Sequence, residues 1–236
     1  MAPGGTERAA WGRVLSSFVH DGGVDYAGLQ ARPEDLESFL ASLAAARPET
    51  LDPSQALAFW CNAYNAVVLR HVLDRYPGIE SVKEEDGFFN GLTFPVAGAE
   101  RTLDEIETEG RALGDPRIHF AVVCASTSCP DLFDEPFRGE EIDSQLSRLT
   151  GGFLADPTKG MRYDSDGTLW LSSIFKWYAG DFTGGSTVVA FFSRGGVADW
   201  VRGQLPPAAA AEIGDSSKVR YLDYDWGLND RPAEGR

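Results

Sequence analysis

Apolar residues recur at helical spacing in several stretches of the chain, and this pattern predicts most of its helices. Residues 6–19, 33–46 and 139–155 each place bulky apolar side chains three or four positions apart, which is typical of an amphipathic helix. We expect one face of each helix to lie against a core. By the same reasoning, further helices are expected over residues 102–113, 174–178, 186–194 and 196–205.

The segment that follows residue 52 differs because it is apolar almost all round. Asp52-Pro53-Ser54-Gln55 combines a capping side chain with proline at the first helical position, which indicates a helix start. The apolar run covers residues 56–76, and Pro77-Gly78 ends it. A helix without a polar face lies in the middle of a protein. The sequence therefore predicts a central, buried helix.

Strands are predicted at four separate places along the chain. Residues 88–101 and 161–171 are typical of hairpins, the second with Asp166-Gly167 at its turn. The apolar run 117–124 is expected to be a buried strand, and residues 219–225 alternate apolar and polar side chains as a strand does.

Unequal helices separate these strands, so they do not form a regular series of parallel units. We expect an α+β fold with a single domain, in which the central buried helix packs on a mostly antiparallel sheet. Residues 1–23 would be an N-terminal helical extension, residues 24–229 the domain, and residues 230–236 a tail.

The net charge disfavours nucleic acid and anionic lipid as partners, and the hydropathy of the chain gives no membrane-spanning segment. A net charge of −15 disfavours binding to nucleic acid, which needs clustered Lys and Arg, and to anionic lipid. No window reaches eighteen consecutive apolar residues, so no membrane-spanning segment is predicted. Residues 1–13 lack the apolar region of a secretion signal, and we expect a cytoplasmic protein.

The chain has three cysteines, and Cys129 is the best candidate for a reactive one. Pro130 follows it directly, a pattern typical of a helix start with the thiol at the capping position. The helix dipole would then favour the thiolate. The alternative is a turn cysteine that merely caps a short helix. Cys61 and Cys124 are expected to be small buried side chains.

Three further residues could complete a cysteine-dependent site. His119 is a candidate base, and Asn62 or Glu107 could orient its imidazole. Each also has a structural explanation. His119 could be a core histidine, and Asn62 could tie the central helix to neighbouring backbone together with Asn65. Glu107 and Arg111, four residues apart on a helix, could form an ion pair.

Motifs for bound groups do not occur. The three histidines lack paired spacing and no C-x₂-C is present, so no metal is expected. The glycine-rich phosphate-binding motifs G-x-x-x-x-G-K-S/T and G-x-G-x-x-G are both missing from the sequence, so no nucleotide or other cofactor is expected. The expected partner is an unidentified small molecule or peptide.

In combination, several of these motifs resemble a known family. They are Val24-Asp25-Tyr26, residues 58–66, residues 103–107, Arg117-Ile118-His119-Phe120, Ser128-Cys129-Pro130, residues 174–178 with Asp181-Phe182, and residues 221–229. Together they resemble the bacterial and plant family called domain of unknown function 547, over residues 24–229.

This resemblance implies a name more than an activity. Family members usually carry an aliphatic residue at the position of Cys61 and often a histidine at that of Thr108, so this chain departs from the pattern twice. Many bacterial relatives look secreted. In eukaryotes the domain occurs beside glutaredoxin-like or coiled-coil segments. The order of elements is similar to papain-like and transglutaminase-like folds, which is an analogy of fold alone.

Three functional hypotheses follow. The first is a cysteine-dependent hydrolase or acyltransferase with Cys129 as nucleophile and His119 as base. The second is a non-catalytic binding or scaffold domain whose buried polar residues are structural. The third is a thiol redox module that uses Cys124 and Cys129.

Overall fold

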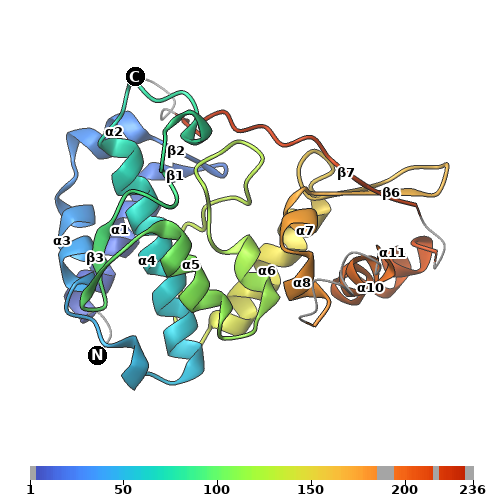
Figure 1. Ribbon diagram of the computed structural model, residues 1–236, viewed down its shortest axis with the longest axis horizontal. Coiled ribbons are helices and arrows are strands. Elements are labelled where there is room, and N and C mark those ends of the chain that lie inside the picture. The colour runs from blue at the N-terminus through green and yellow to red at the C-terminus, as the bar shows by residue number, and fades with distance from the viewer. Residues whose placement is uncertain (1–3, 185–193, 215–217, 232–236) are drawn as a thin grey trace.

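Helix α4 (Pro53–Leu73) runs through the middle of the protein, as the all-round apolar pattern predicts (Figure 1). The computed structural model describes residues 4–184, 194–214 and 218–231. The Asp52 carboxylate caps α4 by accepting the Gln55 N–H at 2.9 Å. Helices α3 (Glu34–Leu43), α5 (Leu103–Arg111) and α6 (Ile142–Ala155) pack against it. The prediction of a central buried helix is confirmed.

Shorter helices surround this group. Helix α1 (Gly5–Phe18) packs on α3, and the remaining helical segments follow in chain order. They are α2 (Tyr26–Ala31), the 3₁₀ turns η1 (Pro48–Thr50), η2 (Val82–Glu84) and η3 (Pro116–Phe120), α7 (Ile174–Trp177), α8 (Ala179–Phe182), α10 (Arg194–Gln204) and α11 (Pro207–Glu212). The helix expected over 186–194 lies outside the described residues, apart from its last position.

The strands form three small sheets, two of them antiparallel hairpins. Strand β1 (Val19–His20) pairs with β2 (Gly23–Val24), and β3 (Phe94–Val96) pairs with β4 (Ala99–Arg101). In the third sheet β6 (Thr168–Leu171) lies between β5 (Met161–Tyr163), which is antiparallel to it, and β7 (Lys218–Tyr221), which is parallel. The α+β class is confirmed, although the sheet is divided and α4 packs mainly against helices.

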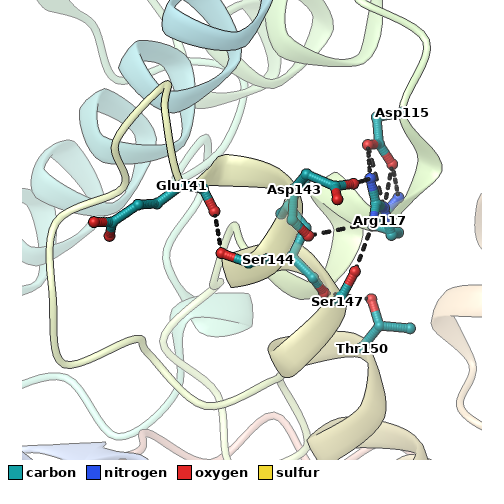
Figure 2. A network of polar contacts seen from close by, with 8 residues as sticks. Asp115, Arg117, Glu141, Asp143, Ser144, Ser147 and Thr150 are labelled. Carbon is teal, nitrogen blue, oxygen red and sulfur yellow. Dashed lines mark hydrogen bonds and ion pairs between the residues drawn. The ribbon is translucent and has the colours of Figure 1, made fainter.

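The strand predicted over 117–124 is wrong, because this stretch is η3 followed by a turn. The preceding residues form a helix start. The Asp115 carboxylate accepts the Arg117 N–H at 3.0 Å, and Pro116 occupies the first helical position. Arg117 also binds α6, donating to Asp143 Oδ1 at 2.8 Å and to Ser147 Oγ at 2.9 Å (Figure 2).

The apolar character of this stretch has another origin, since η3 lies between two hydrophobic clusters. The larger cluster is built by residues 11–146, and the smaller by Phe120 with residues 153–213. Ile118 belongs to the first cluster and Phe120 to the second, so η3 is buried from two sides. Continuous burial is what makes a 3₁₀ turn here look like a buried strand in the sequence.

The segment after β7 continues in extended form across the protein, from the third sheet to β2 (Figure 1). It pairs with the loop that carries the cysteines. The Thr127 N–H donates to the Gly227 carbonyl at 2.8 Å, and the Asn229 N–H donates to the Ala125 carbonyl at 3.0 Å. At the far end, the Val24 N–H donates to the Asn229 carbonyl at 3.0 Å.

Two asparagines of α4 tie the helix to irregular backbone. The Asn62 amide donates to the Phe137 carbonyl at 2.9 Å and accepts the Phe137 N–H at 3.0 Å. The Asn65 amide donates to the Ala121 carbonyl at 2.8 Å and accepts the Val123 N–H at 3.0 Å. Both amides are buried and each both donates and accepts, and Asn62 Oδ1 also accepts the Trp11 Nε1–H at 2.9 Å. These contacts agree with the structural explanation for the two asparagines.

No helix within the described ranges is both long enough and apolar enough to cross a lipid bilayer.

Replacing Asn65 with alanine tests how strongly the fold depends on this pairing. The change leaves a buried carbonyl and a buried N–H without partners, and each such group costs about 1–3 kcal/mol. We expect the free energy of unfolding to fall by about 2–4 kcal/mol in urea denaturation. Asn90→Ala, at an exposed position, is the matched control and should change little. Equal stability of the two variants would contradict this role.

Candidate functional site

A cleft of about 410 Å³ opens where the two hydrophobic clusters meet. The larger cluster contributes Cys129 and Val122 to its wall, and the smaller contributes Ile174 and Tyr178. This volume suits a small organic molecule. The polar groups that line the cleft include both cysteines of the 124–129 loop and the His119 imidazole.

The two thiols of the loop touch each other. Cys124 Sγ lies 3.1 Å from Cys129 Sγ, and the Cys124 N–H donates to Cys129 Sγ at 2.9 Å. Both cysteines are free, so the sulfurs are in contact without being bonded. Cys124 is partly exposed, whereas Cys129 is buried.

Hydrogen bonds gather on the sulfur of Cys124 and make it the more acidic of the two thiols. Besides Cys129, it lies 2.9 Å from Ser126 Oγ and 3.3 Å from the Tyr224 hydroxyl. The Cys129 thiol, followed by the Ser126 and Tyr224 hydroxyls, lowers the pKa of Cys124 to about 7 against the cost of burial. Burial, followed by the neighbouring Cys124, raises the pKa of Cys129 well above its ordinary value. The pair therefore loses its first proton from Cys124, and the remaining proton stays on Cys129.

The chain around the thiols shows why the helix-start prediction for Cys129 is wrong. No helix follows Pro130, so no helix dipole acts on the Cys129 sulfur. Backbone pairing with residues 225–229 shapes the loop instead, and Ala125 adopts a left-handed φ of 60° that redirects the chain between the cysteines. The activated thiol is consequently Cys124, which the sequence suggested was only a small buried side chain.

His119 lies on η3 with its side chain almost fully buried, 1% exposed. Its Nε2 lies 2.8 Å from Asp181 Oδ2, and its Nδ1 lies 3.8 Å from Glu107 Oε1. The Tyr178 ring covers the imidazole at a centroid distance of 3.9 Å. Carboxylates on two sides and an aromatic ring on a third hold the imidazole in one orientation.

Asp181 is ionised in this arrangement. Arg111 binds it with two hydrogen bonds, from Nε at 2.7 Å and from Nη2 at 3.0 Å. The hydrogen bond from His119, followed by those from Arg111, holds the pKa of Asp181 well below its usual range. Because an ionised carboxylate only accepts hydrogen bonds, His119 Nε2 carries a proton and donates a hydrogen bond to Asp181. The ion pair expected between Arg111 and Glu107 is therefore replaced by Arg111–Asp181.

Glu107 lines the cleft with its side chain 10% exposed. Burial raises the pKa of this carboxyl group, although His119 and then Tyr178 lower it. Its Oε1 is buried and has no hydrogen-bond partner. A buried carboxyl group with an unpaired oxygen is costly, so this position is typical of a functional rather than a stabilising residue.

The cleft brings together three of the four residues that the sequence proposes for a site. Cys129, His119 and Glu107 all line it, and within the described residues no hydrogen bond joins the imidazole to either sulfur. Asn62 lines a smaller, separate pocket of about 120 Å³ and holds the backbone of Phe137. Asp181 and Tyr178, instead of Asn62, are the residues that contact the His119 imidazole.

Sequence reasoning did not assign a role to Asp181 or Tyr224, and it considered Cys124 only as one half of a thiol redox pair with Cys129. The signals for them were present. Cys124 lies in the same short stretch as His119 and Cys129, and Asp181 and Tyr224 fall inside segments that carry the family resemblance. Cys61, by contrast, is fully buried on α4 as expected, and burial raises the pKa of its thiol.

No group of three or more His, Cys, Asp and Glu side chains in the described parts of the chain could hold a metal ion.

Comparisons with known proteins give a family and no closer relative. No curated protein and no solved structure matches the chain, and the likeness to papain-like and transglutaminase-like folds stays a prediction. Residues 48–154 match the family described as "Protein of unknown function, DUF547". This range contains α4, Glu107, His119 and both cysteines of the cleft, and the match supports the family resemblance of the sequence.

Proposed function

We propose that this protein is a thiol-dependent enzyme that exchanges its Cys124–Cys129 dithiol with the disulfide bond of a small molecule or peptide. The observation that carries the proposal is the 3.1 Å contact between the two sulfurs at the wall of a cleft. A disulfide bond requires the sulfurs to approach to about 2 Å. Each thiol is thus already placed to attack a disulfide formed on the other.

The exchange has two steps, and Cys124 acts first because it is more exposed and more acidic. Its thiolate attacks one sulfur of the substrate disulfide, forms a mixed disulfide, and releases half of the substrate as a thiol. Cys129 then gives up its proton and attacks the sulfur of Cys124. This step forms the Cys124–Cys129 disulfide and releases the second substrate thiol. The protein dithiol loses two electrons and two protons, and the substrate disulfide gains them.

A second candidate is acyl transfer, and a separate observation favours it. His119 lines the same cleft, and Asp181 holds its Nε2 so that Nδ1 is the nitrogen left for proton transfer. In this mechanism Nδ1 of His119 accepts the thiol proton as the sulfur attacks an acyl carbon, and then gives that proton to the leaving group. Cys129 with His119 was the pairing that the sequence suggested. The lower pKa and greater exposure favour Cys124 as the nucleophile.

The pH dependence of alkylation tests which thiol is activated. Since only the thiolate reacts, labelling of Cys124 by iodoacetamide should rise with pH around a midpoint near 7, below the ordinary value of about 8.5. Ser126→Ala and Tyr224→Phe each remove a hydroxyl from the Cys124 sulfur and should move the midpoint upward. Mass spectrometry of the labelled peptides assigns the site. A midpoint at 8.5 or above for Cys124 would rule out the activated thiol.

Replacing Cys129 with serine separates the two steps of the exchange. Reduced wild-type protein treated with 2-hydroxyethyl disulfide should end with a Cys124–Cys129 bridge and no adduct. Cys129→Ser should accumulate the mixed disulfide on Cys124, because no second thiol can resolve it. Cys61→Ser, which changes a buried thiol that does not line the cleft, serves as the control and should behave as wild type. A stable adduct on the wild-type protein, without a bridge, would end the redox proposal.

Asp181→Asn tests the acyl-transfer candidate. The change keeps the shape of the side chain and removes the charge that orients His119, and acid–base catalysis contributes about 10²–10⁴ to a rate. Turnover of p-nitrophenyl acetate should fall by at least ~100-fold, with circular dichroism as the check on folding. If neither turnover nor a Cys124–Cys129 bridge is observed in the wild-type protein, a non-catalytic binding domain is the conclusion.

A further inference from the structure

The charges that line the cleft are unbalanced. Among the described residues, three carboxyl groups and one ammonium group face it, those of Glu85, Asp104, Glu107 and Lys83. Glu85 has a partner outside, since Arg75 Nε lies 3.0 Å from its Oε1. A thiolate on Cys124 adds a further negative charge. The cleft therefore has a negative potential, and its low-dielectric walls strengthen the field.

Two of these carboxyl groups lack a lysine or arginine partner within the described residues, although His119 Nδ1 lies 3.8 Å from Glu107 Oε1. Asp104 and Glu107 lie one turn apart on α5, and no lysine or arginine pairs with either of them. Like charges at this spacing disfavour each other. Glu107 is nine-tenths buried and keeps one oxygen unpaired, although a buried charge is tolerated only where a partner compensates it. A cation in the cleft would supply that partner.

Aromatic rings also line the cleft. Trp177 stacks on Trp226 at a centroid distance of 5.6 Å, and Tyr224 packs against both at 4.8 Å and 4.7 Å. Trp177 is 47% exposed, which is unusual for so large an apolar side chain. Ring faces attract cations, and Lys83 Nζ already lies 5.4 Å from the centre of the Trp226 ring.

We infer that the cleft selects disulfides that carry a protonated amine, an inference that rests on the exchange proposed above. The ammonium group would lie near Asp104 and Glu107, beside the aromatic rings, while the sulfur reaches Cys124. Anionic disulfides would meet two unpaired carboxyl groups and a thiolate. Substrate charge, rather than shape alone, then decides which disulfide oxidises the Cys124–Cys129 pair.

The test compares three small disulfides that differ mainly in charge. Cystamine carries two ammonium groups, 2-hydroxyethyl disulfide is neutral, and 3,3′-dithiodipropionate carries two carboxylates. The rate constant for oxidation of the protein by each is divided by the rate constant for its reaction with 2-mercaptoethanol, which corrects for intrinsic reactivity. At low ionic strength we expect cystamine to exceed dithiodipropionate by at least about tenfold, or about 1.4 kcal/mol.

Variants on α5 locate the selectivity. Asp104→Asn removes an exposed carboxylate, so the fold should tolerate it, and Glu107→Gln removes the buried one. Each should reduce the preference for cystamine over the neutral disulfide. Glu109→Gln is the matched control, because Glu109 lies on the same helix, pairs with Arg101 and does not line the cleft. It should keep the preference.

A probe without sulfur keeps the inference separate from the function on which it rests. We expect n-butylammonium to shift the indole NMR signals of Trp177 and Trp226 in wild-type protein, and Asp104→Asn to weaken this binding. Equal corrected rates for all three disulfides, or no binding of n-butylammonium, would overturn the selectivity. Binding of n-butylammonium without oxidation by any disulfide would support the amine site and end the exchange proposal.

Discussion

The position of the reactive loop depends on one buried amide. Asn65 projects from the central helix and replaces the missing sheet partner of residues 121–123, by accepting one backbone N–H and donating to one backbone carbonyl. An amide can do both at once because it carries a donor and an acceptor side by side. The chain leaves η3 at this point, and Cys124 is the next residue. A rigid helix thereby fixes a loop that has no regular structure of its own.

The cleft is a product of how two hydrophobic clusters meet. Each cluster is continuous by itself, and η3 contributes to both, so the seam between them contains His119. A seam is where polar groups can be buried without interrupting either core. It also explains why acid–base groups from α5, η3 and α8 converge there although they are distant in sequence, as His119 and Asp181 are at 62 residues apart.

Local signals in the sequence were sufficient for most helices and hairpins. The Asp52 cap and the Asp166-Gly167 turn both lie where their patterns indicate, and the helix expected over residues 102–113 is α5. The stretch 117–124 was misjudged because burial on two sides removes the periodicity that separates a turn from a strand. The helix expected after Pro130 failed for a different reason, since residues 225–229 pair with this loop and override its local preference.

The site was harder to predict than the fold. Three of four candidate residues line one cleft, yet the activated thiol is Cys124, whose acidity comes from Cys129, Ser126 and Tyr224. Tyr224 is 100 residues away in sequence, and nothing local to either residue indicates their contact. Asp181 is likewise brought to His119 only by tertiary packing. Spacing along the chain cannot show such pairs. The Tyr224 contact arises from the path of the segment after β7, and the Asp181 contact from the position of α8.

That path has a consequence for biosynthesis. Domains fold from the N-terminus as they leave the ribosome, so the cysteine loop emerges long before the strand that clamps it. Until residues 225–229 arrive, the loop lacks its backbone partners, and Cys124 lacks the phenol of Tyr224. A nascent chain that lacks these residues thus carries an ordinary thiol pair, and Cys124 acquires its acidity only after residues 224–229 have been synthesised and have docked on the loop.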